Sequence, residues 1–258
     1  ILRDELYPAD GDIGIIPTLR LDYTSDLEDP VRLLWNAGFF FKPSEWLTIR
    51  ANGFHSFRNP DFYELYYSYG QFEGNPDLRP ELSWGGDLGI LFEKEHFLLE
   101  SVLFCTLYHD LIRSLLSYGF IYRPMNDDSV LSCGAEIRGK ARLFNRITLQ
   151  AGYLFNFLGD TEDIQEGIMR QLPGRPLHTL SAKAEYSTNS LAMGTEASFR
   201  DRTGITWNNL KTIPAAAIVD LYAKIAFDFP KDHTRLVMHA TAANIFNVYT
   251  IDIRNYPL

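Results

Sequence analysis

Cysteine is scarce in this chain of 258 residues, where it occurs only as Cys105 and Cys133. Two cysteines cannot form a disulfide framework, and their spacing is not that of zinc ligands. No run of about 18 consecutive apolar residues occurs, so the sequence predicts no transmembrane helix. The 24 lysine and arginine residues are outnumbered by 33 aspartate and glutamate residues, and the net charge of −9 argues against nucleic-acid binding.

The residue patterns of known catalytic centres are missing as well. No Ser–His–Asp order, Walker loop or Rossmann glycine pattern occurs, and the six histidines do not have the spacing of metal ligands. We therefore expect no catalytic residue, no resident metal and no cofactor, and we expect that the protein is not an enzyme. The acidic segment 159–166 leaves weak calcium binding open, whereas a solvated loop is the default interpretation.

What the sequence does have is an alternation of apolar and polar residues with a period of two, which is typical of strands with one apolar face. Between Ser132 and Leu143, four charges fall on one face and none on the other. We predict about twelve such strands, most of them long, centred near residues 19, 37, 51, 88, 103, 115, 137, 151, 181, 195, 223 and 240. The strand near 115 could instead be the end of the strand before it, which would leave eleven.

The connections between these strands alternate in length. Short ones are expected at 42–45, 93–96, 144–146, 187–190 and 229–233, and long ones at 58–80, 119–128, 159–175 and 201–214. Aromatic residues fall on the apolar faces near both strand ends, at Phe39, Phe41, Phe92, Tyr186, Phe227 and Phe229 on the short-turn side and at Trp84, Phe155, Phe157 and Phe199 on the long-loop side. This asymmetry and two aromatic girdles are typical of outer-membrane barrels. A soluble β-sandwich is the alternative, and the strand length argues against it.

The opposite face of the predicted strands is polar and carries charges of both signs, as expected for the water-filled interior of a barrel. Its members are Arg50, Asn52, Asp87, Glu100, Glu136, Arg138, Lys140, Arg142, Lys183, Glu185, Glu196, Arg200 and Lys224. Cys105 and Cys133 fall on the apolar faces of neighbouring strands. Two free thiols facing lipid are the expected state there, and a cross-strand disulfide stays open.

The segment from Arg58 to Glu81 reads RNPDFYELYYSYGQFEGNPDLRPE. It resembles a stretch of the TonB-dependent outer-membrane receptors that runs F-R-x-P-x-x-x-E-L-Y and then G-N-P-x-L-K/R-P-E. The matching residues are Phe57, Arg58, Pro60, Glu64, Leu65, Tyr66, Gly74, Asn75, Pro76, Leu78, Arg79, Pro80 and Glu81. Turn chemistry alone accounts for these residue types, but not for a second match to the same family far downstream.

That second match is Ala243-Asn244-Ile245-Phe246-Asn247-Val248-Tyr249, which resembles the N-L-F-N-x-x-Y signature before the family's last strand. A strand-end turn at Asn244 and Asn247 is its simplest structural interpretation. Two strand starts are also similar to the family, at Gly86-Asp87-Leu88-Gly89, where Asp87 departs from the usual glutamate, and at Gly134-Ala135-Glu136-Ile137. The resemblance covers nearly the whole chain.

The resemblance implies an all-β fold, a transmembrane antiparallel β-barrel of about 22 strands with an N-terminal plug domain inside. We expect residues 1–258 to be the C-terminal portion of that barrel, with about 11–12 of its strands, no second domain and no plug. Such a segment would stop before the terminal strand and would not fold on its own, because two open edges would face lipid. Its long loops would be extracellular and its short turns periplasmic, in a bacterial outer membrane.

The function that the resemblance implies is energy-coupled uptake of a scarce nutrient, most often a ferric siderophore or another metal chelate. The expected partners are outer-membrane lipid, the plug and remaining strands of the same receptor, the TonB complex acting through the plug, and a small-molecule ligand. A passive porin-like or structural barrel is the alternative. Ligand contact is best assigned to an aromatic loop whose rings could equally pack on one another, namely Tyr63, Tyr66, Tyr67, Tyr69 and Phe72.

Overall fold

A computed structural model of the chain describes residues 2–3, 11–23, 31–117, 121–205, 209–229 and 234–249. Its long strands are β2 (Ile13–Tyr23), β3 (Val31–Ser44), β4 (Leu47–Arg58), β7 (Glu81–Lys94), β8 (Phe97–Ser117), β9 (Ile121–Leu143), β10 (Ile147–Asp160), β11 (His178–Ser187), β12 (Leu191–Arg200), β15 (Ala216–Phe229) and β16 (Thr234–Ala242). Eleven long strands thus occur within the described residues, and the strand expected near 115 is the end of β8. The turn expected at 230–233 lies outside the described residues, as does the side chain of Phe229.

Shorter elements occupy the connections. They are β1 (Leu2–Arg3), α1 (Phe62–Tyr66), β5 (Ser68–Tyr69), β6 (Phe72–Glu73), α2 (Thr161–Gln165), β13 (Thr203–Gly204) and β14 (Thr212–Ile213). Both helices have five residues, and no helix in the described part of the chain is long and apolar enough to cross a membrane.

The long loop expected at 119–128 is wrong, because β9 already begins at Ile121. Two contacts extend this strand. Tyr122 pairs in parallel with Phe72 of β6, and the side chains of Pro124 and Val130 are fully buried. Neither contact leaves a signal in the local sequence, where the proline and several polar residues favour a loop.

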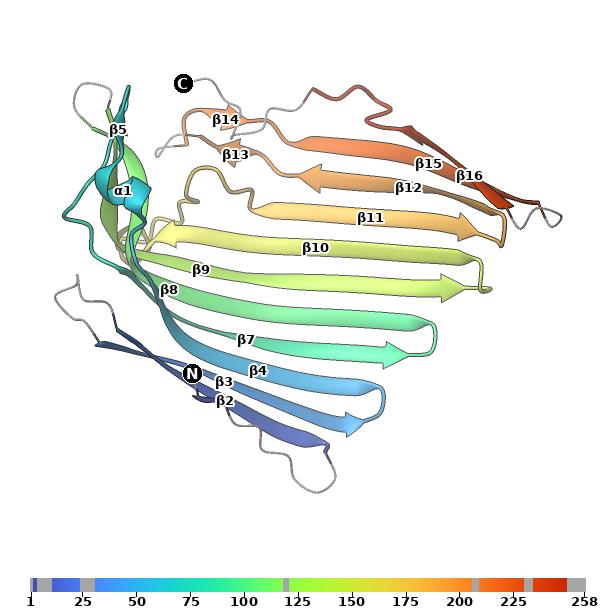
Figure 1. Cartoon of the computed structure of the whole chain (residues 1–258), viewed down its shortest axis with the longest axis horizontal. Coiled ribbons are helices and arrows are strands. Elements are labelled where there is room, and N and C mark those ends of the chain that lie inside the picture. The colour runs from blue at the N-terminus through green and yellow to red at the C-terminus, as the bar shows by residue number, and fades with distance from the viewer. Residues whose placement is uncertain are drawn as a thin grey trace. The chain divides into compact units, whose positions relative to one another are not determined.

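The long strands form a meander in which each one is hydrogen-bonded to the next, in the order β1-β2-β3-β4-β7-β8-β9-β10-β11-β12-β15-β16. Short turns dictate this order, because antiparallel neighbours are the strands that a tight turn can join. Figure 1 shows β10, β11 and β12 running side by side. Their register is antiparallel, with Leu149 opposite Ala184 and Lys183 opposite Glu196. The predicted all-β antiparallel sheet is confirmed.

The chain divides into two compact units. The first comprises Ile1–Gly89, Leu103–Cys133 and Phe157–Arg170, and the second comprises Ile90–Val102, Gly134–Asn156 and Gln171–Leu258. In the first unit the buried apolar side chains of the described residues are Leu34, Leu78, Val130 and Phe157. Leu78 lies in a connection and Phe157 near the end of β10, whereas Leu34 and Val130 lie within β3 and β9.

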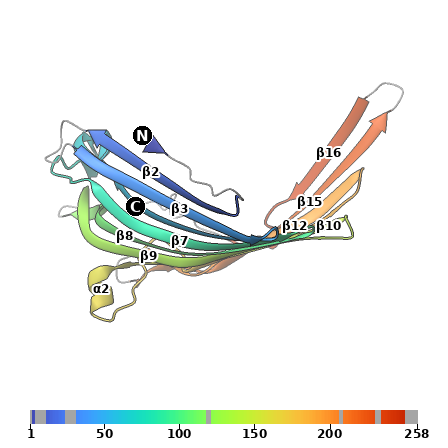
Figure 2. The same cartoon turned by 90° about the horizontal axis from the view of Figure 1, so that it is seen from below.

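Phe157 was expected in an aromatic girdle, and this expectation is wrong, since its side chain is only 8% exposed. The segment after β10 returns over its ring. A Cβ atom at Gly159 would lie 2.5 Å from that ring and 3.1 Å from the carbonyl oxygen of Arg170. The same segment carries α2, which lies beside β9 (Figure 2), and there the Thr161 hydroxyl donates to the Ser129 carbonyl at 3.2 Å.

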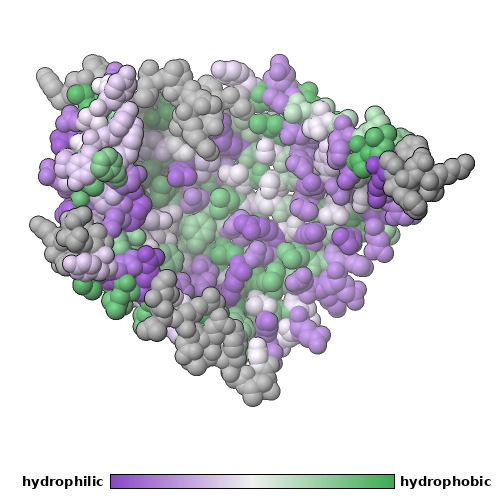
Figure 3. Space-filling model, in the orientation of Figure 1, coloured by the Kyte–Doolittle hydropathy of each residue, from purple (hydrophilic) through white to green (hydrophobic). Residues whose placement is uncertain are grey.

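The second unit displays the predicted alternation directly. Lys183 stands opposite Glu196, which stands opposite Asp220, so these charged residues share one face. The neighbouring row on the other face consists of Ala182, Ala197 and Val219. Figure 3 shows hydrophilic side chains gathered on the face that carries the charged row. The opposite face is apolar and uncovered, with Leu149, Met193 and Leu221 exposed at 40%, 44% and 44%.

Candidate functional site

The aromatic loop is built around α1, whose start follows from local sequence. The Asp61 carboxylate accepts from the Glu64 backbone N–H at 2.7 Å, and the Glu64 carboxylate accepts from the Asp61 backbone N–H at 2.9 Å. This reciprocal pair is a capping box, which satisfies two of the backbone donors that a helix start leaves open. A five-residue helix therefore forms where a loop was expected.

Arg58 ties this helix to two strands. Its guanidinium donates to both carboxylate oxygens of Glu81 at 2.8 Å, and to those of Glu64 at 2.9 and 3.1 Å. Arg58 ends β4, Glu64 lies in α1 and Glu81 begins β7. The planar fork of arginine suits this double bidentate contact, which lysine cannot reproduce. All three residues belong to the family-like motif, so the motif encodes a contact between elements.

We define the aromatic platform as the rings of α1 and the segment after it, namely Phe62, Tyr63, Tyr66, Tyr67, Tyr69 and Phe72. Part of it packs internally, since Tyr63 stacks on Tyr67 at 4.1 Å between ring centroids and lies 4.9 Å from Phe72. The other rings face outward, and Phe62, Tyr66 and Tyr69 are exposed at 77%, 58% and 79%. Of the five predicted contact residues, three thus form a cluster and two are presented to solvent. Their role in ligand binding stays a prediction.

The second half of the motif holds the platform against β9. A Cβ atom at Gly74 would lie 2.8 Å from the backbone of Leu65 and Tyr66, so only glycine fits under α1. The Asn75 side chain donates to the Pro124 carbonyl at 3.0 Å, and Leu78 is buried at 7% exposure. Hence Gly74, Asn75 and Leu78 have structural roles in this loop. The other motif residues of this stretch include Pro76 and Pro80, which fix the chain direction on either side of Leu78.

Asn126 completes this attachment, and sequence reasoning missed it. Its side chain accepts from the Arg79 backbone N–H at 2.8 Å and donates to the Arg79 carbonyl at 2.9 Å. It also donates to the Asp110 carbonyl at 2.7 Å, and the Asp110 carboxylate pairs with the Arg79 guanidinium at 2.5 Å. Asn126 was hidden in the segment interpreted as a long loop, and only its residue type, common in turns, could have marked it.

The downstream motif forms a strand-end turn, as its residue types predicted. Asn244 and Asn247 have positive φ values of 50° and 48°, a region that asparagine tolerates better than most residues. The Asn244 backbone N–H donates to the Asp220 carboxylate at 2.6 Å, and its side chain bonds both backbone groups of Val248 at 2.8 and 2.9 Å. Phe246 between them is 68% exposed.

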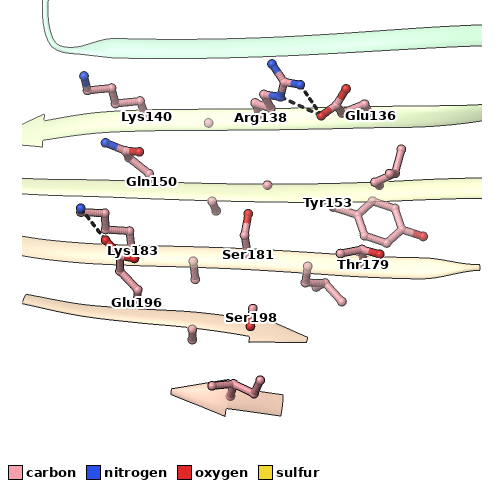
Figure 4. A pocket seen from close by; sticks show the side chains of 18 of the residues that line it. Glu136, Arg138, Lys140, Gln150, Tyr153, Thr179, Ser181, Lys183, Glu196 and Ser198 are labelled. Atoms are coloured by element: carbon pink, nitrogen blue, oxygen red, sulfur yellow. Dashed lines mark hydrogen bonds and ion pairs between the residues drawn. The ribbon is translucent and has the colours of Figure 1, made fainter. Parts of the chain in front are cut away.

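A polar groove of about 660 Å³ lies on the charged face of the second unit, lined by residues of β9, β10, β11 and β12 among others. In Figure 4, Arg138 points toward Glu136 and Lys183 toward Glu196; both ion pairs measure 2.6 Å. Lys140 also lines the groove (Figure 4), so five of the residues predicted for the barrel interior meet there. The paired charges give the groove a polar wall with charges of both signs.

The two cysteines form a disulfide, with 4.1 Å between the Cα atoms of Cys105 in β8 and Cys133 in β9. The expectation of two free thiols is therefore wrong, and the cross-strand alternative holds. Direct cross-strand neighbours lie within the distance that a disulfide spans, which the sequence could not establish without the register.

The acidic segment after β10 has protein partners for two of its carboxylates. Asp160 caps α2 by accepting from the Glu162 backbone N–H at 3.0 Å, and Asp163 pairs with Arg170 at 3.2 Å. Among the described residues, no group of three or more His, Cys, Asp and Glu side chains is arranged to hold a metal ion.

A family model for the TonB-dependent receptor-like β-barrel matches residues 2–248. The chain belongs to this family. The match takes in the first motif and all of the second except Tyr249, so the residues around Asn75 and Asn244 are those of a TonB-dependent receptor barrel.

Solved structures of similar fold agree with the assignment. The ferric enterobactin receptor PfeA of Pseudomonas aeruginosa matches with a TM-score of 0.74 and 18% identity, over 95% of this chain and 38% of its own. The copper transporter OprC matches with a TM-score of 0.75 and 16% identity, over 96% of this chain and 41% of its own. BauA, the ferric preacinetobactin receptor of Acinetobacter baumannii, matches with a TM-score of 0.71 and 13% identity, over 95% and 38%. At these identities the likeness establishes the barrel fold alone.

Among curated proteins, transferrin-binding protein A of Neisseria meningitidis serogroup B is 34% identical over 101 residues. That alignment covers 39% of this TonB-dependent receptor chain and 11% of the relative. The chain therefore spans only a small part of this relative, and about two fifths of the similar solved structures.

Proposed function

We propose that residues 1–258 are the C-terminal portion of the β-barrel of an outer-membrane receptor and that these residues form no second domain. We further propose that the whole receptor takes up a scarce metal chelate, above all a ferric siderophore, by energy coupling. The family match over residues 2–248 carries this proposal. Receptors for ferric enterobactin and ferric preacinetobactin and a copper transporter share the fold, which supports a metal-containing ligand.

In this proposal the apolar face of the strands contacts lipid of the bacterial outer membrane. Its half-exposed leucines and methionine have no protein cover in the second unit, and lipid would supply it. The remaining strands of the same receptor would pair with the open edges, because an unpaired edge is not tolerated in lipid. Long loops are extracellular and short turns periplasmic.

The charged face lines the interior, where the plug of the same receptor sits. Mixed ion pairs such as Lys183–Glu196 suit a water-filled contact with such a domain. The TonB complex acts on the plug, and therefore only indirectly on this chain. The protein is not an enzyme, carries no resident metal or cofactor, and has no nucleic-acid partner.

The aromatic platform contacts the small-molecule ligand. Three of its rings, Phe62, Tyr66 and Tyr69, are more than half exposed, and rigid rings offer contact area at a low entropic cost. The rings of Tyr63, Tyr67 and Phe72 pack on one another, and Phe62 lies 5.1 Å from Tyr66 between ring centroids.

The test is growth of a strain without this receptor on single iron or cobalt sources, namely ferric enterobactin, ferric preacinetobactin, haem, iron-loaded transferrin and cobalamin. Loss of growth on one of these sources, restored by the full-length gene, is the expected result. Normal growth on every source would contradict the transport proposal.

A passive barrel is the alternative function. A plug domain and a TonB box encoded upstream, together with uptake that stops when TonB is deleted, would exclude it. Uptake that continues without TonB would favour it.

A further inference from the structure

The aromatic platform has two attachments of different kinds. On one side, Arg58 joins Glu64 and Glu81 through charged side chains, and the Arg58 side chain is 44% exposed. On the other side, residues 75–79 contact the β8–β9 hairpin through hydrogen bonds between asparagine side chains and backbone groups. Water screens exposed ion pairs, whereas the hairpin attachment combines hydrogen bonds with the burial of Leu78 and Pro124, so we expect the hairpin attachment to contribute more to the position of the platform.

The hairpin is hydrogen-bonded to residues 75–79 at both ends of this segment. Asn75 at its start donates to the Pro124 carbonyl of β9 at 3.0 Å. Arg79 at its end has both backbone groups bonded by the Asn126 side chain, at 2.8 and 2.9 Å. Leu78 between them is 7% exposed, and the side chain of Pro124 is fully buried. The path of these five residues is therefore fixed relative to β9.

Both hydrogens of the Asn126 side-chain amide are donated to hydrogen bonds. One of its two hydrogens goes to the Arg79 carbonyl and the other to the Asp110 carbonyl at 2.7 Å. Asp110 is set for this contact by a φ of 56°, which interrupts the regular course of β8. Asn126 thus links the platform segment, β8 and β9 with a single side chain.

Residues 74 and 75 contact α1 directly, so the position of this segment determines the position of the platform. Gly74 lies so close to Leu65 and Tyr66 that no side chain fits between them, and the Asn75 backbone N–H donates to the Glu64 carbonyl at 2.8 Å. The helix α1 must therefore follow any shift of Asn75. We infer that Asn126 is a positioning residue which, together with the bridge between Phe72 and Tyr122, fixes the aromatic platform on the β8–β9 hairpin. Its consequence for ligand uptake rests on the proposed function.

The test uses the full-length receptor in intact cells and measures chymotrypsin cleavage after the aromatic residues of 62–72. Asn126→Ala removes all three amide contacts, and we expect cleavage about tenfold faster than in the unaltered receptor. Arg79→Ala is the matched control, because it removes the ion pair of a 67% exposed side chain and leaves both Arg79 backbone contacts. We expect it to change cleavage less than about twofold. Asn126→Asp keeps the acceptor and loses both donors, and should fall between them.

Unchanged cleavage of Asn126→Ala, or an equal effect of Arg79→Ala, would overturn the inference. If Asn126→Ala does not assemble in the membrane, Asn126→Asp against Arg79→Ala decides in the same way. Uptake of ferric enterobactin and of iron from loaded transferrin supplies the second readout. A loosened platform should raise the half-saturating concentration while receptor amount and maximal rate stay constant. Faster cleavage with unchanged uptake constants would uphold the positioning role of Asn126 and remove the platform from the proposed ligand site.

Discussion

Two regions of the molecule are stabilised in different ways. The loop assembly of the first unit comprises residues 58–81 together with Asp110 and residues 122–126, and the sheet wall of the second unit comprises the parts of β9, β10, β11 and β12 that line the polar groove. In the wall, β11 and β12 satisfy each other's backbone groups, and the side chains only have to be polar on one face and apolar on the other. In the loop assembly, side chains such as Asn126 and Asn75 bond backbone groups 47 and 49 residues away in the chain. Alternation specifies the wall, whereas single residue identities specify the loops.

This difference predicts which substitutions each region tolerates. Most wall residues can be exchanged for another residue of the same polarity, because the ladder of backbone bonds remains. Gly194 is an exception, since a Cβ atom there would lie 2.5 Å from the Ala184 carbonyl oxygen. A loop residue such as Gly74 or Asn126 has no equivalent, since its size or its donor geometry is used directly. The following experiments test that contrast, beginning with the largest effect.

The disulfide between Cys105 and Cys133 should dominate the stability of the β8–β9 hairpin. The two residues are 28 apart in sequence, and removing a cross-link of that loop length costs about 3–4 kcal/mol in the chain-entropy model. The double variant Cys105→Ser/Cys133→Ser should therefore lower the unfolding free energy of the full-length receptor by that amount in urea titration. Ser198→Thr in the polar groove, which keeps both cysteines and the polarity of its position, is the control.

Thiol labelling provides the direct check on the same bond. The denatured receptor should react with maleimide at Cys105 and Cys133 only after reduction. Labelling of both residues without a reductant would show that the cross-link is not present in the membrane-inserted protein.

The two faces of the wall should differ sharply in their tolerance of charge. Ala182 and Ser181 are neighbours in β11 and therefore point to opposite faces. Ala182→Arg places a charge against lipid and should destabilise the receptor by about 2–4 kcal/mol if this level lies near the bilayer midplane. Ser181→Arg lies in the polar groove and should be nearly neutral. Equal effects of both substitutions in urea unfolding would contradict the assignment of faces.

Much of the wall was predictable, because its signal is repeated along every strand. The faces around Lys183 and Ala182 follow from the period of two alone, and the short turns follow from the breaks in that period. The strand start at Ile121 was not predictable, since Pro124 favours a loop and its carbonyl accepts from the side chain of the distant Asn75. Strand extension by tertiary contact leaves no local pattern.

The sequence supplied the residues of the candidate site, whose role in ligand binding stays a prediction, but it did not supply their connections. The motif located Arg58, Gly74 and Asn75, and the structure gives each of them a contact. Asn126 was missed because a hydrogen bond to a backbone group places no demand on the sequence of the partner. The disulfide was undecided for a related reason, since its formation depends on the register of β8 against β9.

Substitutions at Asn244 can distinguish the contribution of its backbone conformation to stability from the contribution of its side-chain hydrogen bonds. Its φ of 50° disfavours alanine, and its side chain bonds both backbone groups of Val248. Asn244→Ala loses both contributions and should cost about 2 kcal/mol, whereas Asn244→Gly keeps the backbone freedom and should cost about 1 kcal/mol. Urea midpoints of the full-length receptor measure the difference. An equal loss for both variants would show that backbone strain plays no part.

The ion pairs of the two regions allow the finest comparison. Arg58 in the loop assembly and Arg138 in the wall both pair with carboxylates, with side chains exposed at 44% and 61%. Arg58→Ala leaves Glu64 and Glu81 without their bidentate partner, and after allowance for solvent screening it should cost about 1 kcal/mol. Because α1 depends on Glu64, hydrogen exchange at the amides of Leu65 and Tyr67 should accelerate about fivefold. Arg138→Ala should leave the exchange of its own strand unchanged, since the backbone ladder of the wall does not depend on that side chain. If both arginine variants accelerate exchange equally, the loop assembly is no more dependent on individual side chains than the wall.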